Sequence, residues 1–314
     1  MKEYSISRCE LLPDLLCKIT PNFIYNRYDL WNISQQEGEI SLWMYKEQEH
    51  EIFYEVFVSD QKAMLGLWLV RIDTEKLSRI VKGVFNAYPY VSLVSMNNVL
   101  APVFGQIIMN NHFRIELPKT KEDLDHRLSS KGRYNLRREK RILKEKFGNY
   151  SINHLLPISG ESIDAWHFFF DMKKRVQATE YGLSIPEYCK KYHVTDVYSL
   201  TLGEDNRIAS VFLSCEQCPT VYLENITYDP SLGEFSPGQI LYDEYLKILI
   251  ENKTDEIFLL GGDYLYKKRY GSIEDSIFNC VVYRNKVLNL AKWTERKARR
   301  IGHVIKEKIK QERL

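Results

Sequence analysis

The sequence of 314 residues has little charge imbalance and no long apolar run. Its 44 lysines and arginines against 42 aspartates and glutamates leave a formal charge of +2, so there is no general attraction to nucleic acid and we expect no DNA partner. No stretch approaches the roughly 18 uncharged residues of a membrane-spanning helix. Residues 1–19 also lack the apolar segment of a signal peptide. The sequence therefore predicts a soluble, cytoplasmic protein.

Cysteines are too few and too unevenly placed for a disulfide framework. The close pair Cys215 and Cys218 has the spacing of half a zinc site, but a second Cys or His pair at ligand spacing is missing from the sequence. The seven histidines form no ligand cluster, and no serine lies in a nucleophile elbow. We expect ordinary thiols, no metal and no triad-type hydrolase.

The pattern of apolar residues predicts an α+β protein, because runs that alternate like strands are mixed with helical periods. In the first part we expect a helix over 74–88, capped by Asp73, and strands at 39–47, 51–59, 64–72, 91–96 and 113–117. The second part begins with a helix that Thr120 caps and that is interrupted or bent near 129–132. We then expect strands at 150–155, 197–203, 207–216, 220–229, 256–261 and 278–283, and helices at 161–178, after Ser184, and at 237–252.

Two motifs lie at the carboxyl ends of strands. Ser236-Pro237-Gly238 begins the helix after the strand at 220–229, where free backbone N–H groups either bind an anion or simply form a well-capped helix start. The sequence GGDYLYKKRYGS, residues 261–272, follows the strand at 256–261. A strand, helix, strand connection makes these two strands parallel, so both motifs should border one crevice.

Three blocks of this sequence, SSKGRYNLRREKRILKE, YDPSLGEFSPGQILYDEYLKILIEN and IFLLGGDYLYKKRYGS, resemble the signature blocks of the CelD/BcsL-like acetyltransferases. That family is a branch of the GNAT superfamily of N-acetyltransferases, allied to the Fem-type peptidyltransferases. The resemblance covers about 120–283. It implies a tandem GNAT-like fold with mixed central sheets flanked by helices, divided into an N-terminal GNAT-like half at 1–118, a GNAT acyltransferase domain at 119–285 and a basic C-terminal helix at 286–314.

The resemblance also implies functional residues. Acyl-CoA, most simply acetyl-CoA, would place its pyrophosphate at the start of a helix and its thioester near a lysine. The resemblance implies that the donor is bound by Ser236, Pro237, Gly238, Gln239 and Tyr266. It implies that Lys267 stabilises the oxyanion of the reaction or holds a phosphate. The lysine pattern of the Fem-type enzymes also includes Tyr270 and Gly271, and we expect Tyr270 to contact the acceptor.

A general base is needed to take a proton from the acceptor. Asp263 and Glu224 are the candidates, although Asp263 would equally cap a turn and Glu224 would equally face solvent on an alternating strand. The basic helical segment around 133–141 is either a solvated face or, as the resemblance favours, an acceptor site formed by Arg133, Asn135 and Arg137.

We therefore expect an acyltransferase that acts on an amine or hydroxyl of a sugar, nucleotide sugar or cell-envelope precursor. Two alternatives remain open: a Fem-type peptidyltransferase that uses aminoacyl-tRNA, and a non-catalytic binding protein on a GNAT scaffold. The terminal helix carries many more cations than acids on a broken apolar stripe. It either packs this stripe on the protein, as we expect, or makes a peripheral contact with an anionic membrane surface.

Overall fold

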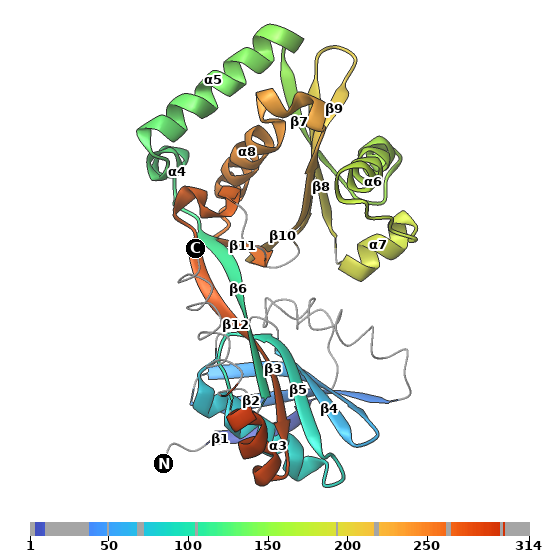
Figure 1. Cartoon of the computed structure of the whole chain (residues 1–314), viewed down its shortest axis with the longest axis vertical. Coiled ribbons are helices and arrows are strands. Elements are labelled where there is room, and N and C mark those ends of the chain that lie inside the picture. The colour runs from blue at the N-terminus through green and yellow to red at the C-terminus, as the bar shows by residue number, and fades with distance from the viewer. Residues whose placement is uncertain are drawn as a thin grey trace, which may run out of the picture. The chain divides into compact units, whose positions relative to one another are not determined.

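The computed structural model describes residues 4–9, 38–48, 50–67, 72–103, 106–192, 194–216, 220–261, 265–295 and 298. The chain forms two compact units, Met1–Asn110 with Ser276–Leu314, and Asn111–Asp275. Each unit contains a mixed β-sheet flanked by helices (Figure 1). Asp263 and residues 299–314 of the predicted terminal helix lie outside the described residues. None of the described helices is both long and apolar enough to span a membrane.

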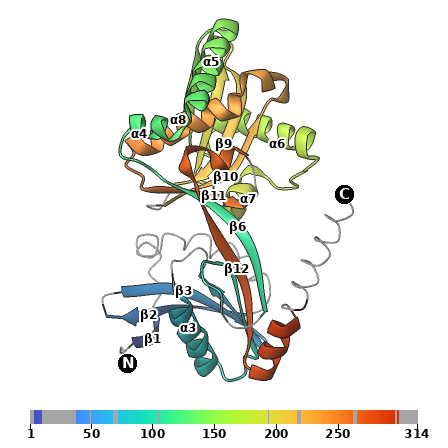
Figure 2. The ribbon, with the colours of Figure 1, turned by 60° about the vertical axis from the view of Figure 1, so that its left-hand side comes forward.

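The first unit is built on a sheet in which β4 (Lys62–Gly66) and β5 (Leu93–Val99) are parallel and the other described pairs are antiparallel. Helix α3 (Thr74–Ala87) connects these two strands, and its N-cap Asp73 accepts a hydrogen bond from the Lys76 amide at 2.8 Å. The apolar side of α3 packs on the sheet (Figure 2), so the predicted helix and its cap are confirmed. The strand order is β1 (Tyr4–Cys9), β2 (Glu39–Glu47), β3 (His50–Ser59), β4 (Lys62–Gly66), β5 (Leu93–Val99) and β12 (Ile273–Tyr283).

The second unit contains the sheet that carries the site. Its strands lie in the order β6 (Gln106–Glu116), β11 (Glu256–Gly261), β10 (Thr220–Tyr228), β9 (Arg207–Cys215), β8 (Asp196–Leu202) and β7 (Tyr150–Leu155). Only β10 and β11 are parallel among its described pairs, and α8 (Pro237–Glu251) connects them. The predicted hairpins and the predicted parallel crossover are therefore confirmed.

Helices cover both faces of this sheet (Figure 1). One face carries α8, α4 (Lys121–Arg127) and α5 (Ser130–Phe147), and the other carries α6 (Ile163–Gln177) and α7 (Ile185–Tyr192). Neighbouring strand residues point to opposite faces, so Tyr198 and Phe212 pack with α8 whereas Val197 and Val211 pack with α6. The predicted interruption separates α4 from α5, where Ser129 accepts from the Gly132 amide at 3.1 Å.

Short 3-10 helices complete the second unit. They are η1 (Gly160–Ser162), η2 (Pro230–Phe235), which precedes α8, and η3 (Leu265–Gly271), which follows β11. Both η2 and η3 lie at the carboxyl ends of the parallel strands, so the two motifs singled out in the sequence meet at the same edge of the sheet.

Candidate functional site

The two parallel strands separate at their carboxyl ends. Their pairing ends at Tyr222 opposite Phe258. At this level β10 has a bulge against β9, with Glu224 as its extra residue, and β11 has a bulge against β6, with Leu259 as its extra residue. Bulges bend a strand and interrupt its pairing, so the two strands move apart where a ligand would enter.

The gap between the strands forms a pocket of about 660 Å³. Its walls come from β10, β11, η3 and the end of α6. The lining residues are Lys173, Val176, Gln177, Leu223, Glu224, Asn225, Ile226, Thr227, Tyr228, Leu259, Leu260, Tyr266 and Lys267. The pocket therefore reaches from the parted strands to the sheet face that α6 covers.

Lys267 lies in this pocket with its side chain almost fully enclosed, at 3% exposure. Its ammonium group donates a hydrogen bond to the Leu260 carbonyl at 3.2 Å. Leu260 has a φ of +58°, a left-handed conformation that costs energy for a residue with a side chain. Burial lowers the pKa of Lys267 from 10.5 to about 8. The group is thus a charged donor at neutral pH that is close to losing its proton.

Glu224 lines the same pocket from the β10 bulge. Its side chain is partly accessible through the pocket, but the surrounding protein removes most of its hydration. Burial raises the pKa of Glu224 well above the ordinary value of 4.5. A carboxylate with a raised pKa is a stronger base once ionised, and the structure brings this sequence candidate into the pocket that holds Lys267.

The sequence prediction missed Lys173, which lines the pocket from α6. Its side chain is 4% exposed, and burial lowers its pKa to about 8. One signal in the sequence was available: Lys173 shares the buried side of the helix with Trp166, Phe169 and Met172, at helical spacing. A cation on an apolar helix face is unusual unless it is paired or serves a ligand.

A second pocket of about 220 Å³ lies at the start of α8. It shares Ile226, Tyr228 and Tyr266 with the larger pocket. Its other lining residues are Gly233, Ser236, Gly238, Gln239 and Tyr242. Backbone amides in the first turn of a helix favour anions. In α8, Pro237 has no N–H and the Gln239 amide donates to the Ser236 carbonyl at 2.9 Å, so Gly238 supplies the amide of this turn that can face an anion.

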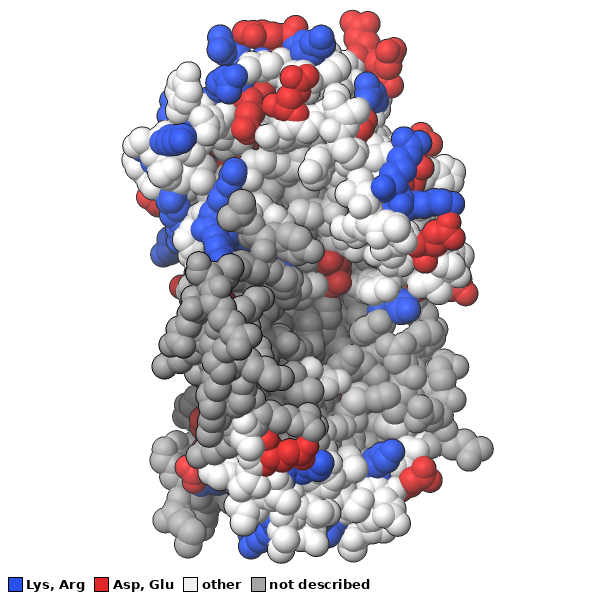
Figure 3. Space-filling view, in the orientation of Figure 1, with Lys and Arg blue, Asp and Glu red and all other residues white. Residues whose placement is uncertain are grey.

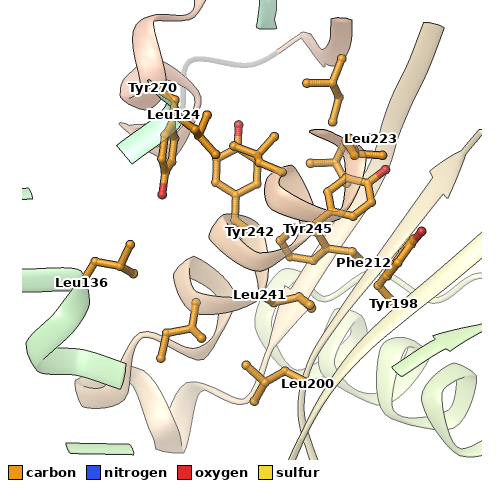
Figure 4. Close-up of a cluster of buried hydrophobic side chains, with 14 of the residues drawn as sticks. Leu124, Leu136, Tyr198, Leu200, Phe212, Leu223, Leu241, Tyr242, Tyr245 and Tyr270 are labelled. Carbon is orange, nitrogen blue, oxygen red and sulfur yellow. The ribbon is translucent and has the colours of Figure 1, made fainter. Parts of the chain in front are cut away.

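Two buried donors in the smaller pocket have no hydrogen-bond partner among the described residues. They are the Gln239 side-chain nitrogen and the hydroxyl of Tyr242, whose side chain is 1% exposed. Tyr242 lies beside Tyr245 and Tyr270 in the buried cluster shown in Figure 4. A buried donor without an acceptor is costly, and both donors suit the oxygen atoms of a ligand. These features fit an acyl-CoA, whose phosphate and amide oxygens would supply acceptors.

Most of the predicted donor and catalytic residues therefore line these two adjoining pockets, whereas Asp263 lies outside the described residues. Ser236, Gly238, Gln239 and Tyr266 line the smaller one, with Pro237 as the first residue of α8. Lys267 and Glu224 line the larger one.

The predicted acceptor residues on α5 are not among the residues that line either pocket. The Arg133 guanidinium donates to the Leu128 carbonyl at 2.6 Å and so caps the end of α4. Asn135 and Arg137 lie on the exposed side of α5. Tyr270 is buried, and its hydroxyl donates to Asp243 at 2.7 Å.

Asp243 is the centre of a buried ionic network that joins α8 to α5. Its carboxylate is 2.7 Å from the Lys140 ammonium and 3.0 Å from that of Lys247. Burial alone would raise the pKa of Asp243, but the Lys140 ammonium and the Tyr270 hydroxyl outweigh it, and the pKa is lowered. This network holds the helix that begins at the smaller pocket.

Across the described ranges, His, Cys, Asp and Glu side chains form no group of three that could hold a metal.

Comparisons with known proteins concern the fold of the chain. Residues 130–268 match the family model described as an acetyltransferase (GNAT) domain. No curated protein matches the chain. The crystal structure of FemX is similar with a TM-score of 0.59 at 8% identity, over 87% of this chain and 96% of that one. A conserved protein of unknown function from Bacteroides thetaiotaomicron gives a TM-score of 0.52 at 11% identity, over 88% of this chain and all, 100%, of that one.

At these identities the structural likeness concerns the fold alone. Residues 130–268 thus match a GNAT acetyltransferase domain, and the chain has an α+β, GNAT-like fold with mixed sheets flanked by helices, as the sequence predicted.

Proposed function

We propose that the second unit transfers an acyl group, acetyl in the simplest case, from acyl-CoA to an amine or hydroxyl of an acceptor. The proposed acceptor is a sugar, a nucleotide sugar or another precursor of a cell-envelope polysaccharide, and the proposed compartment is the cytoplasm. The acceptor class comes from the likeness of three sequence blocks to the CelD/BcsL-like acetyltransferases. The matched GNAT domain supports the reaction class.

The observation that carries the proposal is the separation of β10 from β11 with two adjoining pockets at the gap. The smaller pocket lies at the N-terminus of α8 and suits the pyrophosphate and pantetheine arm of the donor. The larger pocket opens toward α6 and suits the acceptor. Ile226, Tyr228 and Tyr266 line both, so the reacting atoms would meet between the strands.

Lys267 and Glu224 would perform the chemistry. The acceptor's lone pair forms a bond to the thioester carbon while Glu224 takes the proton that the acceptor loses. The Lys267 ammonium stabilises the negative charge that develops on the carbonyl oxygen. The carbon–sulfur bond then breaks, and a proton returned to the sulfur leaves coenzyme A as a thiol. Holding both reactants in one gap supplies much of the rate enhancement.

A Fem-type reaction is the second candidate, because FemX shares the fold. Binding of tRNA requires many phosphate contacts from lysine and arginine. On the face of the second unit drawn in Figure 3, Lys and Arg atoms are interspersed with Asp and Glu atoms. The mixed charges on this face therefore give the Fem-type reaction no added support.

Isothermal titration of the full chain with acetyl-CoA tests the proposal. We expect binding that Gly238→Val weakens by about tenfold or more, because a Cβ at Gly238 would lie 3.3 Å from the Tyr228 ring and its branches would fill the pocket. Gly182→Val is the matched control, since a Cβ there meets no atom within 4 Å. Circular dichroism checks that both variants fold.

Three results would contradict the proposal. Absence of acetyl-CoA binding together with RNase-sensitive transfer from aminoacyl-tRNA would establish the Fem-type alternative. Binding of neither donor would favour a non-catalytic protein. Equal affinity of the two glycine variants would show that acetyl-CoA binds elsewhere.

A further inference from the structure

Lys173 differs from its neighbours on α6 because none of the acidic residues that the structure describes pairs with it. Its ammonium group donates to the Gln177 side-chain oxygen at 3.3 Å and lies 5.6 Å from the centre of the Phe169 ring. Lys174 and Arg175, the next two residues, pair with Glu180 at 2.5 Å and with Asp171 at 2.9 Å. Within the described part of the chain, no ion pair involves Lys173, and none joins it to Glu224 across the pocket.

A buried ammonium group without a counter-charge is costly, because a single neutral acceptor replaces only part of its hydration. At Lys140 the cost of burying the ammonium group is offset by the carboxylates of Asp243 and Glu244, at 2.7 and 2.6 Å. At Lys173 the available space is the pocket of about 660 Å³ that the side chain lines. An anionic ligand in this pocket would supply the negative charge and the hydrogen-bond acceptors that the buried ammonium group of Lys173 needs.

We propose that Lys173 binds an anionic group of the acceptor, a carboxylate or a phosphate, and so restricts the enzyme to anionic acceptors. This inference rests on the proposed acyl transfer. Lys173 reaches the pocket from α6, whereas Glu224 and Lys267 reach it from β10 and η3. The acceptor is held by its anion at the α6 side, with its nucleophile toward Glu224 and the thioester.

An ammonium group suits either anion because it acts as a compact point charge with rotatable donors. The acceptor is then recognised at the buried end of α6 and not by Arg133 and Arg137 of α5. It also explains why an apolar helix face carries a lysine.

Binding of small anions to the full chain tests the inference. Thermal unfolding is followed against rising potassium phosphate and, separately, potassium malonate, with ionic strength held constant by chloride and coenzyme A present to occupy the donor site. Dissociation constants come from the concentration dependence of the melting temperature. The variants are Lys173→Met, Lys173→Arg and the matched control Lys174→Met, which removes an exposed charge from the same helix.

We expect the wild type and Lys174→Met to bind phosphate, malonate or both alike. Lys173→Met should bind roughly ten- to a hundredfold more weakly, as expected for one charge-assisted hydrogen-bonded contact. Lys173→Arg should retain part of the affinity because it keeps the charge. The preferred anion identifies the acceptor group as phosphate or carboxylate.

Equal affinities in Lys173→Met and Lys174→Met would overturn the inference, and so would the absence of binding of either anion to the wild type. Titration of the same variants with acetyl-CoA separates this failure from failure of the proposed function. If acetyl-CoA binds normally while the anion result is negative, only the role of Lys173 is wrong. If acetyl-CoA does not bind, the proposed acyl transfer is wrong.

Discussion

Replacing Lys267 with methionine should make the protein more stable while abolishing acyl transfer. The side chain is 3% exposed, and burial lowers its pKa from 10.5 to about 8, so the folded state disfavours the charge. Methionine has a similar length and carries no charge. Replacing a residue that serves catalysis at the expense of stability lowers activity and raises stability. Replacing a structural residue lowers both activity and stability.

The size of the effect follows from the pKa. A folded-state value about 2.5 below the unfolded value corresponds to about 3 kcal/mol, at about 1.4 kcal/mol for each pH unit. The hydrogen bond from Lys267 to the Leu260 carbonyl acts in the opposite direction and contributes about 1 kcal/mol. We therefore expect Lys267→Met to gain about 2 kcal/mol at pH 7.

The stability that Lys267→Met gains over the wild type should decrease as the pH rises. Below about pH 8 the ammonium group is charged in both states, and the wild type bears the full cost of burial. As the pH rises from about 8 to 10.5, the folded state releases the proton while the unfolded state keeps it, so wild-type stability rises. The advantage of the variant should therefore be largest near pH 7 and should shrink toward pH 10.

Urea denaturation of the full chain between pH 6 and pH 10 measures this difference. Lys268→Met is the matched control, because Lys268 is exposed on the same short helix and its removal should change stability by less than about 0.5 kcal/mol. A Lys267→Met protein less stable than the wild type at pH 7 would refute the reasoning. A gain that is the same at pH 7 and pH 10 would refute it too.

Two further predictions concern a pH profile and a buried ionic network. Because transfer needs Glu224 ionised and Lys267 charged, kcat/KM should fall at low pH, as a carboxyl with a pKa above 4.5 is protonated, and again above about pH 8. Glu224→Gln should lower kcat about 100- to 10,000-fold and remove the acid limb, and an unchanged acid limb would exclude this base. Asp243→Asn should lose about 1–3 kcal/mol of stability at pH 7 in urea denaturation, because Lys140 and Lys247 lose the buried carboxylate that they share, although Glu244 and Asp125 still pair with them. Its deficit should shrink below about pH 3.8, where the wild-type carboxyl also loses its contribution, and a deficit that did not change with pH would contradict an ionic origin.

The donor side of the site could be predicted from short-range patterns. A strand, a turn with Ser236-Pro237-Gly238 and an amphipathic helix specify their own order, and the next strand then has to be parallel to the first. This is why the two motifs, which contain Gly238 and Lys267, meet at adjoining pockets, whereas the roles expected of Gly238, Tyr266 and Lys267 came from the family resemblance. The acceptor side contains no such local unit. Arg133, Asn135 and Arg137 form a prominent run of polar residues, yet the pocket is completed by α6 instead.

The sequence by itself determined most of the described elements, since the spacing of apolar residues and the capping residues Asp73, Thr120 and Ser129 depend on neighbours within a few positions. It did not predict β1, and it placed the strand β4 at 64–72 instead of Lys62–Gly66. Only the tertiary structure decided that bulges separate β10 from β11, and that Lys173 shares a pocket with Lys267 nearly one hundred positions later. It also decided that β12 returns to pair with β5 in the first unit. The physical reason is that strand register and the packing of a helix on a sheet depend on contacts between distant segments, and residue spacing along the chain does not specify them.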